Sequence, residues 1–106
     1  MVTTGKIAQA AERLHEARPE ATIILFGSRA RGDADEKSDT DFLVVLSSKP
    51  RSLRKEMLEL ANVIRPFRLF ADVLVVSRPR FLESSRVPGT LYHSALTEGK
   101  LVYGGL

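Results

Sequence analysis

The order of apolar and polar positions in the first quarter of the chain predicts a helix followed by a buried strand. Apolar side chains recur at the spacing of one helix face over about residues 4–17, and Pro19 follows. The positions that share this face are Ile7, Ala10, Ala11 and Leu14. Residues 22–26 then form an uninterrupted apolar run that ends at Gly27, which is typical of a strand buried on both faces.

The rest of the chain continues this alternation. Buried strands are predicted at residues 41–46 and 69–76, on either side of a helix whose apolar positions are Leu53, Met57, Leu60, Ala61 and Ile64. Residues 79–86 fit either a helical turn or a loop, within a segment, 77–89, that we interpret as a surface connection. Residues 89–99 fit a helix with Gly99 beyond its end, and residues 100–104 a short last strand. The pattern predicts an α/β (α+β) fold, with a small mixed sheet of three to four or more strands and helices packed on it.

Composition narrows the class of protein. The 106 residues are 43% hydrophobic and 27% charged, which predicts one domain over residues 1–106 with a single core. The absence of cysteine excludes disulfides and thiolate metal sites. No signal pattern and no apolar run of about 18 residues is present, so we expect a cytoplasmic protein without a membrane span.

The charge is modest and unevenly placed. Residues 1–53 carry eight basic and eight acidic side chains, and residues 54–106 carry eight basic and five acidic ones, for a net charge of +3. This surplus suits an anionic ligand or an acidic partner surface. Without an aromatic and basic ribonucleoprotein signature, nucleic-acid binding is possible but not favoured.

Two aspartates at the start of the second strand are candidate metal ligands. Asp39 and Asp41 are two residues apart, so in a strand both carboxylates project from the same face. Adjacent carboxylates repel one another unless a cation or a proton neutralises them, and a hard divalent cation does this well. The alternative is a solvated turn rich in Asp, Thr and Ser.

A third carboxylate, Asp72, is the one charged residue in the strand predicted at residues 69–76. A carboxylate inside a buried strand needs hydrogen bonds, a counter-charge or a metal. The candidate counter-charges are Arg65, Arg68 and Arg78. If the second and third strands are neighbours, Asp72 instead completes a cluster with Asp39 and Asp41 that can hold two magnesium ions, an arrangement suited to phosphoryl transfer.

The segment between the first two strands supplies a candidate phosphate site. Gly27 permits a close backbone approach, and free N–H groups with the Ser28 hydroxyl would face an anion if a helical turn begins there. Arg29 and Arg31 can add neutralising charge, and Ser38 completes the candidate nucleotide-binding set. The alternative is a junction between strand and turn with solvated arginines.

The stretch "LFGSRARGDADEKSDTDFLVVL" resembles the G-S-x10-D-x-D signature of the DNA polymerase beta-type nucleotidyltransferase superfamily, and in particular the minimal nucleotidyltransferase (MNT) domains of prokaryotes. The resemblance implies a polymerase beta-like fold, with Gly27 and Ser28 at the nucleoside triphosphate. It further implies that Asp39 and Asp41 hold magnesium and that Asp72 is the third carboxylate and helps to activate the attacking hydroxyl. ATP would be the substrate, with two Mg²⁺ ions.

The small size extends the resemblance to a biological role. After a sheet and its helices are built, we expect no residues to remain for an acceptor-binding domain, as in the MNT antitoxins of HEPN–MNT toxin–antitoxin pairs. Such an antitoxin binds a HEPN ribonuclease and can transfer AMP to one of its tyrosines. The alternatives are a non-catalytic binding module, an enzyme acting on a small molecule, and an RNA-modifying enzyme. The last would use the arginines that bracket the third strand, Arg65, Arg68, Arg78 and Arg80.

Overall fold

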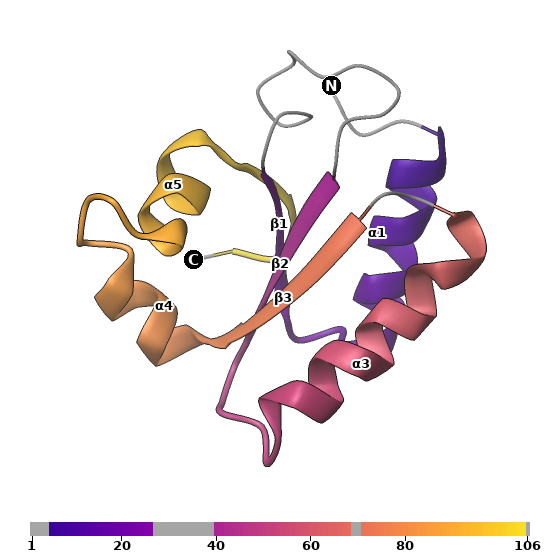
Figure 1. The fold of residues 1–106 in the computed structure, drawn as a ribbon, viewed down its shortest axis with the longest axis horizontal. Helices are drawn as coiled ribbons and strands as arrows, with labels where there is room; N and C mark the ends of the chain where they lie inside the picture. The colour runs from indigo at the N-terminus through magenta and orange to yellow at the C-terminus, as the bar shows by residue number, and fades with distance from the viewer. Residues whose placement is uncertain (1–4, 27–39, 69–70, 106) are drawn as a thin grey trace.

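A four-stranded sheet lies between two layers of helices in the computed structural model, which describes residues 5–26, 40–68 and 71–105 (Figure 1). One layer consists of α1 (Gly5–Ala17) and α3 (Leu53–Ile64), and the other of α4 (Arg78–Ser84) and α5 (Leu91–Glu98). The strands are β1 (Thr22–Phe26), β2 (Thr40–Leu46), β3 (Ala71–Ser77) and β4 (Lys100–Tyr103), in the spatial order β3-β2-β1-β4. The mixed sheet with packed helices confirms the predicted fold class.

Strand directions bring several chain segments together at one end of the sheet. β2 and β3 are parallel and joined through α3, so both begin at the same end, at the top of Figure 1, which we call the upper end. β1 is antiparallel to β2 and therefore ends there. β4 is antiparallel to β1 and begins there, with Lys100 opposite Leu25. The upper end is thus where the strands that carry the candidate site meet.

The core is divided by the sheet into two clusters. The helical repeat predicted for α1 is confirmed, because its four apolar positions are buried against the sheet and α3. The buried residues on this side include Leu14, Ile23, Leu25, Phe42, Val44, Leu60, Ile64, Val73 and Val75. The smaller cluster, on the other side, consists of Ile24, Phe26, Leu43, Val45, Val76, Phe81 and Ala95. We refer to these sides as the α1/α3 face and the α4/α5 face.

Arg18, just beyond the end of α1, ties this helix to α3. Its guanidinium forms ion pairs with Glu56 and with Glu59, the latter at 2.9 Å, and it also donates to the Ala17 carbonyl oxygen at 2.7 Å. Burial lowers the pKa of Arg18, but hydrogen bonds with the two carboxylates and their charge outweigh this, and the pKa lies above its ordinary value. The α1/α3 layer is therefore held together by both apolar and ionic contacts.

Local signals set the ends of the helices. The Ser52 hydroxyl oxygen caps α3 by accepting from the Lys55 amide at 3.2 Å. After α3, the 3-10 turn η1 (Arg65–Phe67) contains Pro66, and Arg68 takes the left-handed conformation, with φ of 53°, ahead of β3. The longest described helix, α1, has 13 residues, and no helix in the described parts of the chain could cross a membrane.

The segment 77–89 is not the surface connection that we interpreted, and the helical alternative for residues 79–86 is confirmed. The segment contains α4, which begins after Ser77 with Pro79 in its first turn and is anchored by the buried Phe81. Leu53 lies at the first residue of α3, as its place in the helical repeat predicts, and is 38% exposed. The strands at 22–26, 41–46 and 100–103 and the helix before Gly99 are confirmed.

Candidate active site

Asp41 and Asp72 lie directly opposite each other on neighbouring parallel strands. Each is the second residue of its strand, and their Cα atoms are register partners between β2 and β3. Asp41 precedes Phe42, and Asp72 precedes Val73, both of which belong to the cluster on the α1/α3 face. Because side chains alternate along a strand, both carboxylates project on the α4/α5 face. The condition on which the predicted carboxylate cluster depended, adjacency of the second and third strands, is therefore met.

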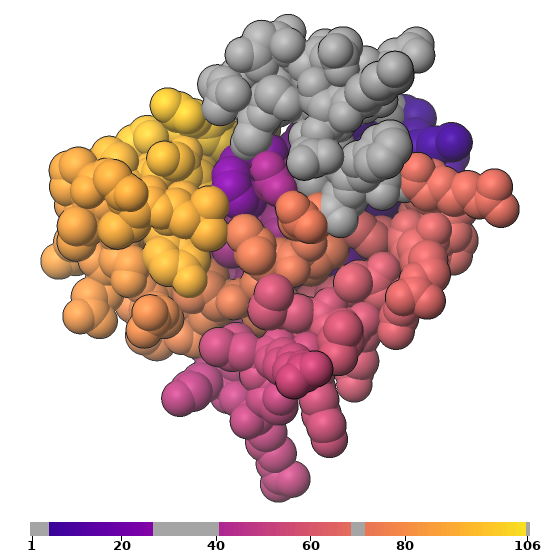
Figure 2. Space-filling view, viewed as in Figure 1, coloured from indigo at the N-terminus to yellow at the C-terminus, as the bar shows by residue number. Residues whose placement is uncertain are grey.

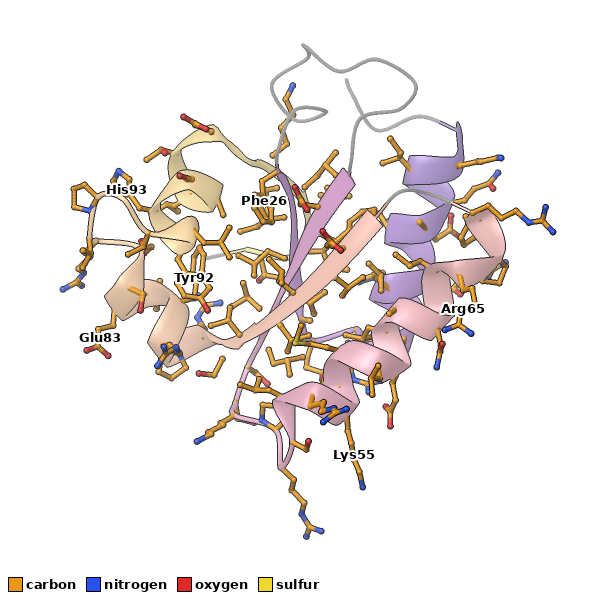
Figure 3. The ribbon with its side chains drawn as sticks, viewed as in Figure 1. Phe26, Lys55, Arg65, Glu83, Tyr92 and His93 are labelled. Atoms are coloured by element: carbon orange, nitrogen blue, oxygen red, sulfur yellow. The ribbon has the colours of Figure 1, made fainter. Side chains whose placement is uncertain are left out.

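The end of β1 reaches the same place. Phe26, its last residue, is the register partner of Asp41 and belongs to the cluster on the α4/α5 face (Figure 3). Gly27, the first residue of the candidate phosphate segment, follows Phe26 in the sequence. The remaining predicted site residues lie outside the described residues: Gly27, Ser28, Arg29, Arg31, Ser38 and Asp39.

The surroundings of Asp72 differ from the expectation for a buried strand. Its side chain is exposed, since it lies at the start of β3 before the first buried residue, and Asp41 is partly buried. Asp72 takes part in no ion pair between described residues. Arg78, one of the predicted counter-charges, begins α4 at the far end of β3, where it donates to the Gly105 carbonyl oxygen at 3.0 Å. An accessible carboxylate is better suited to contact with a substrate than to a role in a structural ion pair.

The paired carboxylates fit a hard divalent cation. Two like charges held side by side at the start of parallel strands attract a cation, and carboxylate oxygens are the ligands that Mg²⁺ prefers. Within residues 5–26, 40–68 and 71–105 no group of three acidic or histidine side chains is arranged to hold a metal. Asp39, the third predicted ligand, is not among these residues, so the pair is two of the three carboxylates predicted from the sequence.

The four arginines named for an RNA-binding surface do not lie at one end of the sheet. Arg65 and Arg68 lie between the end of α3 and the start of β3, towards the upper end. Arg78 and Arg80 lie in the first turn of α4, beyond the other end of β3. Figure 3 shows Arg65 on the α1/α3 side of the sheet, whereas the aspartates project on the opposite face. The described residues thus give no support to a single basic surface around the carboxylates.

Gly99 lies close to β1, which the sequence pattern does not reveal. A Cβ atom on it would lie 2.7 Å from the Ile24 Cγ2 atom and 3.2 Å from the Leu25 carbonyl oxygen. Glycine therefore lets the turn between α5 and β4 approach β1 closely near the upper end. A glycine after a helical pattern predicts the end of a helix. This pattern is the same whether or not a strand packs against the glycine, so the sequence does not reveal the close approach.

The sequence is similar to a protein family and to a named relative. The family model for the nucleotidyltransferase domain matches residues 6–86, which include the G-S-x10-D-x-D motif and Asp72. A protein of Methanocaldococcus jannaschii that carries the provisional name protein adenylyltransferase is 40% identical over 53 residues, 50% of this chain and 52% of that protein. The chain thus aligns with about half the length of this relative.

Two solved structures share the fold. A crystal structure of a provisionally named nucleotidyltransferase from Sulfolobus solfataricus has a TM-score of 0.60 and 25% sequence identity, covering 92% of this chain and 77% of that chain. Another structure with the same provisional name has a TM-score of 0.59 and 18% identity, covering 94% of this chain and all of the other, and it bears on the fold alone. The predicted nucleotidyltransferase fold is therefore confirmed.

Proposed function

Because this chain belongs to the nucleotidyltransferase domain family, we propose that it transfers AMP from ATP to a hydroxyl group of a partner protein. The observation that carries this proposal is the register of Asp41 and Asp72, which sets two carboxylates side by side on one face where β2 and β3 begin. The name of the relative from Methanocaldococcus jannaschii supports a protein as the acceptor.

The proposed reaction exchanges one bond at the α-phosphorus for another. The oxygen of the acceptor hydroxyl forms a bond to the α-phosphorus, the bond from this phosphorus to the oxygen bridging to the β-phosphate breaks, and pyrophosphate leaves. Asp72, which is exposed, accepts the proton of the attacking hydroxyl. Asp39, Asp41 and Asp72 would hold magnesium, which when bound neutralises the charge of the phosphates. Gly27 and Ser28 would hold the phosphates beside the end of β1.

The acceptor that we favour is a tyrosine of a HEPN-type ribonuclease. The resemblance to MNT antitoxins supports this choice, and the protein would then neutralise its toxin in the cytoplasm by adding AMP to it. A second mode of neutralisation, in which the protein blocks the ribonuclease by binding alone, differs in one respect that can be measured: it does not require the carboxylates.

The test is transfer of label from ATP labelled on the α-phosphate to the protein encoded by the adjacent gene, in the presence of Mg²⁺. Asp41→Asn and Asp72→Asn should each lower the rate by about 100-fold or more, since each removes a charge that acts on the reacting groups. Glu12→Gln, at an exposed position of α1, is the matched control and should leave the rate unchanged. Chelation of Mg²⁺ should stop the transfer.

Two results would contradict the proposal in different ways. Label transfer that persists in the Asp41→Asn/Asp72→Asn double variant would exclude these residues as the reacting site. Neutralisation of the ribonuclease by the same variant, without any label transferred, would instead establish the binding mode.

A further inference from the structure

The outer edge of β3 borders a cavity of about 490 Å³ near the lower end of the sheet. Three consecutive residues of the strand, Val75, Val76 and Ser77, line it. Val75 packs in the cluster on the α1/α3 face and Val76 in the cluster on the α4/α5 face, so their side chains point in opposite directions. A cavity that borders all three must lie against the outer edge of the strand backbone and not over one face of the sheet.

This edge of the strand is open within the described sheet. β3 is the first strand in the order β3-β2-β1-β4, and its one described neighbour is β2. The space-filling view shows atoms of β3 at the surface between the two helical layers (Figure 2). The outer edge of such a strand presents backbone donors and acceptors that an extended peptide can pair with.

The walls of the cavity combine apolar and charged groups. Lys49 and the exposed Leu53 lie on the side of α3, and Arg80, Glu83 and Tyr92 on the side of α4 and α5. Figure 3 shows Glu83 and Tyr92 on the same side of the sheet, and the Tyr92 ring is held in place by a T-shaped contact with a phenylalanine ring, with centroids 6.1 Å apart. Two cations and one anion beside the apolar part of the lining favour a large apolar side chain flanked by acidic residues.

The same strand connects the cavity to the candidate active site. Asp72 and Val76 are four residues apart on β3 and project on the same face, because side chains alternate with a period of two. In a strand paired with this edge, a residue beside Val76 and a residue beside Asp72 would also be four positions apart, about 13 Å. The spacing between anchor and acceptor hydroxyl is therefore fixed by β3 itself.

We propose that the acceptor protein enters the site as an extended segment that pairs with the outer edge of β3. A large apolar side chain of this segment enters the cavity and occupies part of it, and the residue that bears the hydroxyl lies four positions away, beside Asp72. Acidic residues next to the apolar anchor face Lys49 and Arg80. This inference rests on the proposed function, because it names how the acceptor of that reaction is held.

The probe is a set of synthetic decapeptides of Val and Glu that carry one Phe and one Tyr separated by one to six positions. With ATP labelled on the α-phosphate and Mg²⁺, transfer to the Tyr should be fastest at a separation of four, by about tenfold over three or five, since a shift by one residue turns the side chain to the other face. In the best peptide, N-methylation of alternate backbone amides along one edge should abolish binding, measured by fluorescence anisotropy, whereas N-methylation along the other edge should not.

Charge reversal on the protein tests the walls of the cavity. Arg80→Glu and Lys49→Glu should each weaken binding of the acidic peptide about tenfold. Lys55→Glu is the matched control, since Lys55 is exposed on α3 and does not line the cavity, and should leave binding unchanged. Asp72→Asn should bind the peptide as the unaltered protein does and transfer no label.

The outcomes separate this inference from the proposed function. Peptides that bind with the alternating N-methyl pattern, with no label transferred to them or to the adjacent gene's product, would support the edge and overturn the transferase proposal. A different result would overturn the proposed pairing with the edge of β3 and leave the proposed function standing. In that case label is transferred to the adjacent gene's product, but no peptide shows the N-methyl pattern or transfer to the peptides does not depend on the spacing. A homodimer in sedimentation analysis that the peptide cannot dissociate would assign this edge to a second copy of the chain and also overturn the inference.

Discussion

The two faces of the sheet are covered very differently. On the α1/α3 face, helices of 13 and 12 residues pack over the larger cluster, and Arg18 links them through ion pairs. On the α4/α5 face, helices of seven and eight residues cover a cluster half that size. Large apolar side chains of this thinner layer remain exposed, among them Leu82, Leu91 and Leu96.

The two faces of this small sheet therefore differ in role, since one contributes most of the stability and the other carries the candidate catalytic residues. Asp41 and Asp72 project on the α4/α5 face at the upper end. The cavity borders the edge of the same strand, where α4 provides part of the wall. A thin layer over a small cluster opens at a lower free-energy cost than a thick one. We infer that the α1/α3 face holds the fold while the α4/α5 face leaves the carboxylates accessible.

The largest effect on stability is expected when one fully buried phenylalanine is removed from each face. Phe42→Ala, on β2, should lower the free energy of unfolding by about 4 kcal/mol, because two long helices cannot collapse into the void. Phe81→Ala, on α4, should cost about 3 kcal/mol, because the short helix can settle. Urea unfolding followed by circular dichroism measures both.

Hydrogen exchange distinguishes the two variants further. Phe81→Ala should speed exchange in α4 and α5 while β1 and β2 keep their protection, whereas Phe42→Ala should speed it throughout. If Phe81→Ala destabilises the protein as much as Phe42→Ala does and does so globally, the two faces are one cooperative unit and the comparison fails.

A smaller effect is expected where α5 and β4 approach β1. Gly99→Ala would place a Cβ atom 2.3 Å from the Ala95 carbonyl oxygen and 2.7 Å from Ile24 Cγ2, so the backbone must move. We expect a loss of about 2 kcal/mol in the free energy of unfolding, by analogy with overpacked cores. Gly105→Ala, where no atom lies within 4 Å of the added Cβ, is the control and should change it by less than about 0.5 kcal/mol. Equal free energies of unfolding for the two variants would show that the turn accommodates the added methyl group at no cost.

The elements were predictable where one local signal decided them. The run at residues 22–26 is apolar throughout and is buried throughout, so its pattern and its environment agree. The sequence left α4 open between a helical turn and a loop, because Phe81 is its one buried hydrophobic residue and its packing against the sheet stabilises it. Leu53 fits the helix period but is 38% exposed and borders the cavity beside β3, which the local pattern does not reveal.

The site was predictable in part. The sequence marked Asp41 and Asp72 as candidates, but their adjacency depended on strand order, which is set by packing across the whole chain. The cavity was not predictable, because Lys49 and Tyr92 are far apart in the sequence and neither carries a motif. Gly27, Ser28 and Asp39 stay predictions, since they lie outside the described residues.

Adjacent valines on β2 offer a closely matched comparison of the two faces. Val44 is 0% exposed on the α1/α3 face and Val45 is 2% exposed on the α4/α5 face. Val44→Ala should cost about 2 kcal/mol and Val45→Ala about 1 kcal/mol in urea unfolding, because the same lost methyl groups leave a void that the thinner layer can fill. A larger loss for Val45→Ala would reverse the assignment of the faces.

The smallest expected effect concerns the hydroxyls that cap one helix on each side. The Ser52 hydroxyl oxygen accepts one amide, that of Lys55, whereas the Thr90 hydroxyl oxygen accepts the His93 amide, and its single proton lies within reach of the carbonyl oxygens of Val87 at 2.8 Å and of Ser84 at 3.0 Å. Thr90 thereby links the start of α5 to the end of α4 and the segment that follows it. Thr90→Val should cost about 1.5 kcal/mol and Ser52→Ala about 0.5 kcal/mol in urea unfolding. If Thr90→Val costs no more than Ser52→Ala, contacts other than this hydroxyl hold α4 and α5 together, and the thinner layer is more robust than its small cluster indicates.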